Sequence, residues 1–367
     1  MKRVIIVGGG YGGIKALETF ANEDIEVMLI DKNLYHYLQT ESYDFISFNI
    51  SLNDITIPLE SIIKGINKKF KFIQDEAINI ENNTLICKNN VYSFDYLIIA
   101  TGSKTFIPKI FNKDNFYEVK ELQNTIKLKH SFENILHKHL TLKTLSNIVV
   151  IGGGSSGVEI AAEMKNYMNE SPLYKDVKVT LIAEHFLAEI DEESREKAYE
   201  NLRKLGIKII IDRVEKVEND ILYTKNKEIK YSFCILATGI KASDFIENLN
   251  FKKENGFLVV DEYLRVKENI FAIGDCAMLK DKNNKPLPPT AQTAEQSGII
   301  AAKNILRLIN NKPLLKADLK IYGLAIALGG KFAIAITPFF KIDNILGYLG
   351  KKAIEKYYKL NLKLKME

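Results

Sequence analysis

Two glycine-rich runs offer the clearest chemistry in the chain, residues 8–13 and residues 152–157. Each run directly follows a β-branched apolar stretch and opens a helical stretch, which is the context that supports dinucleotide binding. The first glycine of such a turn allows the bend, the second lets backbone N–H groups approach a pyrophosphate, and the third lets helix and strand pack closely. The anion then lies at the helix N-terminus, where the dipole favours it. The candidate ligand-binding residues are Gly8, Gly10, Tyr11, Gly12 and Gly13 in the first run and Gly152, Gly154, Ser155, Ser156 and Gly157 in the second.

Acidic residues follow both runs at the ends of the next apolar stretches. Asp31, with Lys32 beside it, ends the second predicted strand, where a carboxylate can accept both ribose hydroxyls. In the second unit the nearest carboxylate is Glu184, one residue later than expected, because Ala183 occupies the usual acidic place. No Arg or Lys lies between Glu184 and Ile190 to bind a 2′-phosphate, which favours NADH over NADPH. The alternative is that Glu184 is a solvated loop acid.

The same pattern occurs twice along the chain, and each copy closes with Ala-Thr-Gly. The closing residues are Thr101 and Gly102 in the first copy and Thr238 and Gly239 in the second. Continuous β-branched runs followed by helices predict parallel strands that are buried on both faces. We therefore expect an α/β protein with two Rossmann-like doubly wound units.

A third motif, residues 269–275, appears only after the second copy. It ends in Gly274 and Asp275, and an aspartate at this place can reach the ribityl and pyrophosphate region of a cofactor on the first glycine turn. The first unit is therefore expected to be interrupted by the second and to resume near Gly256.

Composition excludes several classes of protein. The chain has 367 residues, 46% hydrophobic and 26% charged, with a net charge of +5, which is ordinary for a soluble globular protein and does not argue for a nucleic-acid partner. Cys87, Cys234 and Cys276 are far apart, which argues against a disulfide scaffold, a cysteine metal site or a dithiol catalyst, and we expect no metal site. The N-terminus has no secretion signal, so we expect a cytoplasmic protein.

The C-terminal segment predicts a hairpin and an amphipathic helix. Residues 322–340 are apolar but broken by glycines and Pro338, which favours two short strands over a membrane span. A basic helix with one apolar face can lie in the interface of an anionic bilayer, although it could instead pack on the body or on a second copy as a homodimer. The apolar positions are Ile342, Leu346, Leu349, Ala353, Tyr357, Leu360 and Leu364, and the lysines beside them are Lys352, Lys356, Lys359 and Lys363.

Over roughly residues 1–310 the chain resembles the FAD flavoproteins with two dinucleotide-binding domains. Within them it resembles the type II, non-proton-pumping NADH:quinone oxidoreductases. Residues 33–39, NLYHYLQ, are similar to that family's NYHxFQP; residues 152–163, GGGSSGVEIAAE, to GGGPTGVExAxE; and residues 288–296, PPTAQTAEQ, to PPTAQxAxQ. The disulfide reductase branch is excluded because paired cysteines are missing, and the sulfide:quinone branch also relies on cysteines.

The resemblance implies FAD in the first unit and NADH in the second. The expected domains are residues 1–114 with 256–320 for FAD, residues 115–255 for NAD(H), and residues 321–367 for the hairpin and the membrane-docking helix. Departures such as Thr40 in place of proline and Ser155-Ser156 in place of Pro-Thr weaken the quinone assignment more than the flavin assignment.

Catalytic residues are implied by the same motifs. Gln292 and Gln296 would line the quinone site, with Ala291 and Gln292 against the flavin, and Glu159 would lie near nicotinamide and flavin. Lys331 is a candidate cation near the flavin edge, where reduction creates negative charge. The alternatives are that Gln292 caps its helix, that Glu159 is a supporting hydrogen-bond acceptor, and that Lys331 is solvated.

The resulting hypothesis is an NADH:quinone oxidoreductase held peripherally on the cytoplasmic face of the inner membrane. One rival is a soluble NAD(P)H-dependent reductase of a ferredoxin or rubredoxin, with the basic C-terminus against an acidic partner. Another is a flavin- and NADH-binding module that senses redox state without rapid turnover.

Overall fold

Two parallel sheets form the framework of the chain in a computed structural model that describes residues 1–112, 116–142 and 146–366. The larger sheet has the strand order β21-β22-β9-β1-β2-β5, and β22 pairs in parallel with β9. The chain thus returns to its first sheet after completing the second, as predicted. The strands are β1 (Arg3–Val7), β2 (Glu26–Asp31), β5 (Lys71–Gln74), β9 (Tyr96–Ile99), β21 (Arg265–Lys267) and β22 (Ile270–Ala272).

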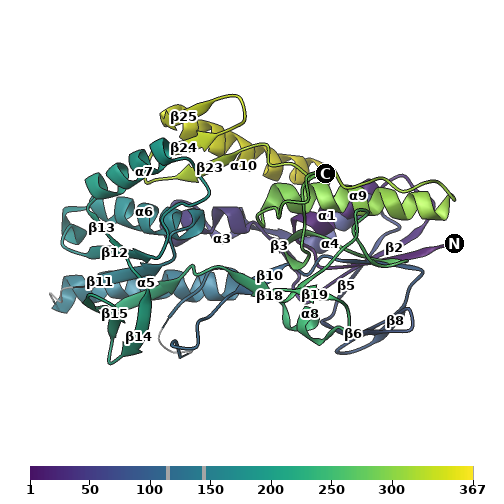
Figure 1. Cartoon of the computed structure of the whole chain (residues 1–367), viewed down its shortest axis with the longest axis horizontal. Coiled ribbons are helices and arrows are strands. Elements are labelled where there is room, and N and C mark those ends of the chain that lie inside the picture. The colour runs from purple at the N-terminus through teal and green to yellow at the C-terminus, as the bar shows by residue number, and fades with distance from the viewer. Residues whose placement is uncertain (113–115, 143–145, 367) are drawn as a thin grey trace.

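The second sheet has the order β13-β12-β11-β17, all parallel, and lies in the other half of the molecule (Figure 1). Its strands β11, β12 and β17 are almost entirely buried, which explains their β-branched sequences. The two sheets confirm the predicted α/β fold class with two doubly wound units. The elements are β11 (Asn147–Ile151), β12 (Lys178–Ala183), β13 (Ile207–Ile211), β17 (Phe233–Leu236), α6 (Ser155–Asn169) and α7 (Glu192–Leu205).

Each unit carries a small antiparallel sheet of three strands after its third parallel strand. An antiparallel pair, β10 with β18, joins the units directly after the two Ala-Thr-Gly endings. These strands are β6 (Ala77–Glu81), β7 (Thr84–Cys87), β8 (Val91–Ser93), β14 (Val214–Glu218), β15 (Ile221–Thr224), β16 (Glu228–Lys230), β10 (Ser103–Thr105) and β18 (Ile240–Ala242). The predicted boundary at residues 114 and 115 touches residues outside the described ranges, so it stays a prediction.

Helices α1 (Tyr11–Thr19) and α9 (Ala291–Ile309) pack with almost no side chain between them. A Cβ atom at Gly298 would lie 2.3 Å from the Gly12 carbonyl oxygen, so only glycine allows this approach. Helix α5 (Leu122–Leu142) lies in the segment of the chain that leads from the first unit to the second. Shorter elements complete the chain: β3 (Tyr35–Tyr37), η1 (Gln39–Glu41), α2 (Ser42–Ile46), α3 (Leu52–Ile55), β4 (Thr56–Pro58), α4 (Leu59–Ile66), η2 (Pro172–Tyr174), α8 (Asp244–Asn248), β19 (Lys253–Glu254), β20 (Phe257–Leu258) and η3 (Gly274–Cys276).

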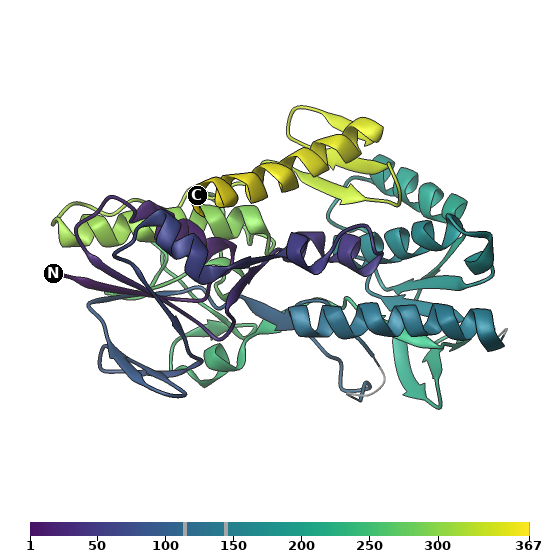
Figure 2. The ribbon, with the colours of Figure 1, turned by 180° about the vertical axis from the view of Figure 1, so that it is seen from behind.

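The C-terminal element is a three-stranded sheet followed by one long helix. The predicted hairpin is present as β23 (Leu324–Ala327) and β24 (Ala333–Ile336). A third strand, β25 (Lys341–Asn344), was not predicted, because its short sequence Lys-Ile-Asp-Asn carries no strong strand signal. Helix α10 (Ile345–Met366) therefore begins later than Pro338 and lies along one edge of the molecule across both halves (Figures 1 and 2).

Helix α10 packs through a charged face and leaves an apolar face exposed. Four of its lysines form ion pairs with the body, to Glu159 on α6, Asp44 on α2, Glu41 on η1 and Glu18 on α1; these lysines are Lys351, Lys352, Lys359 and Lys365. The predicted apolar stripe is exposed from Leu346 onward, whereas Ile342 belongs to β25. In the part of the chain that the structure describes, no helix combines the length and the apolarity needed to cross a bilayer.

Candidate functional site

One cavity of about 1710 Å³ receives the glycine turns of both units, the N-terminus of α9 and the inner face of α10. Because the carboxyl ends of parallel strands meet at one edge of a sheet, the two doubly wound units present their ligand-binding edges to each other here. All but three of the residues predicted to bind ligands or to act in catalysis line this cavity. The exceptions are Gly13, Gln296 and Lys331.

The first glycine turn has the geometry that a pyrophosphate requires. Gly8 has a φ of +108°, and a Cβ atom at Gly13 would lie 1.9 Å from the Gly8 carbonyl oxygen, which is the close packing expected of a third glycine. By contrast, no heavy atom lies within 4 Å of a Cβ built at Gly10 or Gly102, although both line the cavity. Open space therefore lies over bare backbone, and the residues fit a dinucleotide such as FAD.

Asp31 is fixed beside this turn. Its carboxylate accepts hydrogen bonds from the backbone N–H of Gly9 at 2.6 Å and of Asn33 at 2.7 Å. Burial raises the pKa of Asp31, and these two hydrogen bonds oppose the rise. The carboxylate is held at the end of β2, where a ribose is expected.

His36 links the same turn to α10. Its Nδ1 lies 2.9 Å from the Gly9 carbonyl oxygen and its Nε2 lies 3.0 Å from the Tyr358 hydroxyl. A carbonyl only accepts, so Nδ1 carries the proton and Nε2 accepts from Tyr358. Burial lowers the pKa of His36 to about 4, and the ring is neutral at physiological pH.

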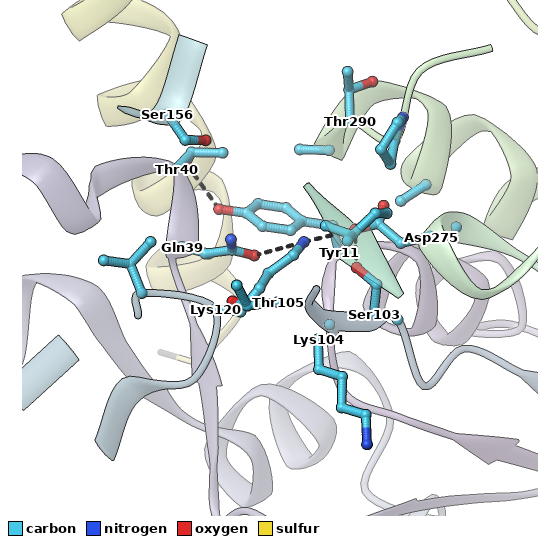
Figure 3. A pocket seen from close by; sticks show the side chains of 18 of the residues that line it. Tyr11, Gln39, Thr40, Ser103, Lys104, Thr105, Lys120, Ser156, Asp275 and Thr290 are labelled. Carbon is cyan, nitrogen blue, oxygen red and sulfur yellow. Dashed lines mark hydrogen bonds and ion pairs between the residues drawn. The ribbon is translucent and has the colours of Figure 1, made fainter. Parts of the chain in front are cut away.

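Asp275 forms an ion pair with Lys120, a residue that the sequence motifs did not predict. Its carboxylate accepts from Lys120 at 2.8 Å and from the Ser103 hydroxyl at 2.9 Å, and Lys120 also lies 3.3 Å from the Gln39 amide oxygen (Figure 3). Lys120 comes from the segment before α5, which carries none of the quoted motifs. Only the fold brings it to the third motif.

The second glycine turn is partly occupied by a side chain of the protein itself. The Glu189 carboxylate accepts a hydrogen bond of 2.9 Å from the Ser155 backbone N–H at the start of α6. This position is where the second pyrophosphate was predicted. A pyrophosphate bound at the predicted position would have to displace Glu189 from the helix N-terminus.

Glu184 lines the same end of the cavity and is half exposed. Arg213 lies beside it, with its Nε 3.7 Å from a Glu184 carboxylate oxygen. Arg213 follows β13, which pairs with β12, so the two strand ends place these residues together. The sequence search for a 2′-phosphate partner covered only the loop after Glu184 and could not find a cation from the next strand.

Glu159 forms a buried ion pair with Lys351 of α10. One carboxylate oxygen accepts from Lys351 Nζ at 2.9 Å and from the Ala327 backbone N–H at 3.0 Å. Burial raises the pKa of Glu159, and Lys351 opposes the rise. Both residues line the cavity, so this pair supplies a cation at its wall.

Two of the predicted catalytic residues, Gln296 and Lys331, do not line the cavity, and Gln292 does. Lys331 is exposed on the β23–β24 turn and does not line the cavity, because the glycines of this turn pack against Asn166 of α6; Lys351 is the cation at the cavity wall. Gln296 binds the backbone of Lys320 through both of its amide atoms. Gln292 lines the cavity, but its amide also binds Tyr322 N–H and the Gly323 carbonyl, so it positions the segment before β23.

A second group of buried charges lies next to this pair, between α2, α6 and α10. Lys352 contacts Asp44 and Glu355, and Tyr43 donates to Glu355 at 2.8 Å. Glu163 is buried beside Asp44, and burial together with that neighbouring carboxylate raises the pKa of Glu163 to about 7. Its proton is therefore held weakly at physiological pH.

A comparison with known families decides the identity of this fold. The family model of the pyridine nucleotide-disulphide oxidoreductases matches residues 2–298. The chain belongs to this family. Its three cysteines are all buried and unpaired, so it lacks the redox-active disulfide of the family name.

Relatives of this oxidoreductase agree with the predicted branch. A protein of Dictyostelium discoideum named "Probable NADH dehydrogenase" is 29% identical, over 95% of this chain and 83% of the relative. A type II NADH:quinone oxidoreductase of Staphylococcus aureus is 28% identical, over 92% and 90%. The resemblance inferred from the motifs is confirmed.

Solved structures support the fold. NDH2 from Plasmodium falciparum in complex with NADH superposes with a TM-score of 0.86 at 21% identity, over 100% of this chain and 96% of that one. The sulfide:quinone oxidoreductase of Aquifex aeolicus superposes with a TM-score of 0.84 at 19% identity, over 100% and 92%.

The Glu184–Arg213 pair predicts how selectivity between dinucleotides can be changed. In Glu184→Gln the charge that repels a 2′-phosphate is lost and Arg213 is released to bind it. The ratio of kcat/KM for NADPH to that for NADH should rise on the order of tenfold. Steady-state kinetics with both nucleotides measure it, with Glu192→Gln, an exposed acid outside the cavity, as the control. An unchanged ratio would show that Glu184 does not face the ribose.

Glu163 predicts a pH dependence of stability. The folded-state pKa of Glu163, about 7, lies above the ordinary 4.5, so the folded protein keeps a proton that the unfolded chain releases. Protonated Glu163 therefore adds to the free energy of unfolding at low pH, and this stabilisation is lost as the pH rises through 7. Glu163→Gln should melt like the parent near about pH 5 and at a higher temperature near about pH 8. Thermal melts at both values test this, with exposed Glu200→Gln as control. Equal melting temperatures at about pH 8 would contradict it.

Proposed function

We propose that this oxidoreductase transfers two electrons from NADH, through bound FAD, to a quinone that enters from a membrane surface. The observation that carries the proposal is the wall of the cavity formed by α10. Ile354 and Tyr357 line the cavity that holds both glycine turns, and they are also 69% and 72% exposed on the outer face of the helix. An apolar route thus runs from the exposed stripe of α10 to the predicted flavin site.

The residues of the chain mainly bind, orient and stabilise charge. The two glycine turns would hold the pyrophosphates, Asp31 the flavin-side ribose and Glu184 the NADH ribose. The chemistry that bound FAD supplies is acceptance of two electrons from NADH and their delivery to quinone. Lys351 would stabilise negative charge near the quinone, and Glu159 would keep that ammonium group in place.

Proton balance gives the buried charges a further role. Oxidation of NADH with reduction of a quinone to a quinol consumes one proton from the surroundings. Glu159, Lys351 and Glu355 line the cavity and contact one another, and Lys352 joins Glu355 to Asp44. These groups would hold that proton at the cavity wall.

The exposed stripe of α10 would rest in the interface of the bilayer. Large apolar side chains at half exposure or more gather on this one face, and water is an unfavourable neighbour for so large a patch. They are Leu346, Leu349, Ile354, Tyr357, Leu360 and Leu364.

Charge contributes less to this docking than the sequence predicted. Lys352 and Lys359 face the body in ion pairs, which leaves Lys356 and Lys363 exposed beside the stripe. An outer face that is more apolar than basic fits a bilayer better than the acidic electron carrier of the rival hypothesis. We place the protein on the cytoplasmic face of the inner membrane as part of the same proposal.

Rapid-mixing spectroscopy on the holoprotein tests the electron transfer. The flavin absorbance should bleach on addition of NADH and return on addition of a short-chain quinone, because both reactants reach the same cavity. Bleaching that the quinone fails to reverse would exclude quinone reduction. An absorbance that NADH does not change would exclude the whole proposal, as would a protein that binds no flavin.

Substitutions on the stripe test the docking. The double variant Leu349→Ser/Leu360→Ser should lose co-sedimentation with vesicles of anionic lipid and keep its activity with a short-chain quinone, since neither residue lines the cavity. Leu173→Ser/Val91→Ser removes two equally exposed apolar residues elsewhere and serves as the control. If the stripe instead joined two copies of the chain, the Leu349/Leu360 variant would have half the parent's mass in solution. Its co-sedimentation with vesicles would then equal that of the parent.

A further inference from the structure

The turn between β24 and β25 exposes two adjacent aromatic residues. Phe339 is 93% exposed, the highest value of any large hydrophobic residue in the described chain, and Phe340 is 54% exposed. Neither residue lines the flavin cavity or belongs to the predicted stripe of α10. The proposed electron transfer gives no reason for such exposure.

The turn is held in one shape by its own hydrogen bonds. The Thr337 hydroxyl accepts from the N–H of Phe339 at 3.3 Å and of Phe340 at 3.1 Å. The Thr337 N–H donates to the Phe340 carbonyl at 2.9 Å, and Pro338 fixes its own φ. The aromatic pair is therefore presented without a large loss of backbone entropy on binding.

Ion pairs brace the turn against the second unit. Lys341, the residue after Phe340, pairs with Asp191 at 2.8 Å, and Asp343 of the same strand pairs with Lys197 of α7 at 2.5 Å. The two phenylalanines are thus fixed to the second doubly wound unit through these two ion pairs.

The turn lies on the same side of the molecule as α10. Strand β25 ends at Asn344 and α10 begins at Ile345, and the β24–β25 hairpin and the helix form one edge in both views (Figures 1 and 2). The first residues of the helix, Ile345, Leu346 and Leu349, are exposed large apolar residues as well.

We propose that the Thr337–Phe340 turn inserts into the bilayer as a second anchor beside α10. This inference rests on the membrane docking of the proposed function and adds a separate contact to it. The occupant is lipid: two convex aromatic side chains are too small for a specific protein interface of about 800 Å² per partner. On the helix that follows, Lys356 and Lys363 are exposed beside the apolar stripe, and their positive charge complements anionic headgroups.

A second anchor changes what the docking can do. Helix α10 is about 33 Å long, and a single helix in the interface can roll about its axis. An anchor beside its N-terminal end prevents rolling, and it therefore holds Ile354 and Tyr357, at the mouth of the cavity, toward the lipid. Quinone entry would then depend on the turn as well as on the helix.

The chain has no tryptophan, so Phe339→Trp creates a single fluorescent reporter at the tip. With the holoprotein and vesicles of mixed phosphatidylcholine and phosphatidylglycerol, its emission should shift to the blue, and brominated lipids should quench it. Leu173→Trp, at a site 61% exposed in the parent and away from α10, is the control and should not respond.

The possible outcomes distinguish a failure of the second anchor from a failure of the proposed docking by α10. If Phe339→Trp co-sediments with vesicles and its emission does not change, the turn is no anchor, while docking by α10 stands. If the protein does not co-sediment at all, the proposed docking and the second anchor both fail.

A second measurement follows the effect on activity. Phe339→Ser/Phe340→Ser should partition onto vesicles at least about tenfold more weakly, because each buried aromatic contributes more than a factor of ten. It should slow reduction of a long-chain quinone in those vesicles and leave short-chain quinone reduction and the melting temperature unchanged. Parent-like partitioning would overturn the inference.

Discussion

The whole arrangement depends on backbone brought closer to backbone than any side chain would allow. At both nucleotide turns the helix begins directly against the carbonyl of the preceding strand, with Gly13 over Gly8 and Gly157 over Gly152. This approach directs the N-termini of both helices at the cavity, where their N–H groups can bind an anion. Gly12 of α1 and Gly298 of α9 make a similar close backbone contact, and this contact places the third motif beside the first turn.

Helix α10 adds a second constraint, because it contacts both units at once. Its lysines pair with acids from α1, η1, α2 and α6, and these ion pairs are largely withdrawn from water. Burying such charges is costly unless each is matched, so the register of the helix on the body is tightly specified. The helix therefore turns four of its lysines inward and most of its large apolar side chains outward, the reverse of an ordinary surface helix.

The sequence was sufficient for everything that depends on local pattern. The places of the glycine turns and of Asp31, the interrupted first unit and the hairpin each follow from spacing within a few dozen residues, and the fold has each of them. The ligands assigned to these residues stay a prediction. Lys351, Lys120 and Arg213 were missed because each reaches the cavity from an element that is distant in sequence and carries no motif of its own. Lys331 was chosen by its place in a motif-like hairpin, and the direction in which that hairpin points decides that it stays in solvent. Amphipathic periodicity located the stripe of α10, but periodicity does not say which face meets the body.

The hydrogen-bonded series from Tyr358 through His36 to Gly9 has a consequence for how the protein would age and be cleared. A protease that clips the terminal helix removes a wall of the cavity and the support of the first glycine turn in one cut. Under the proposed function, the lipid contact and the support of the predicted flavin turn would therefore be lost together.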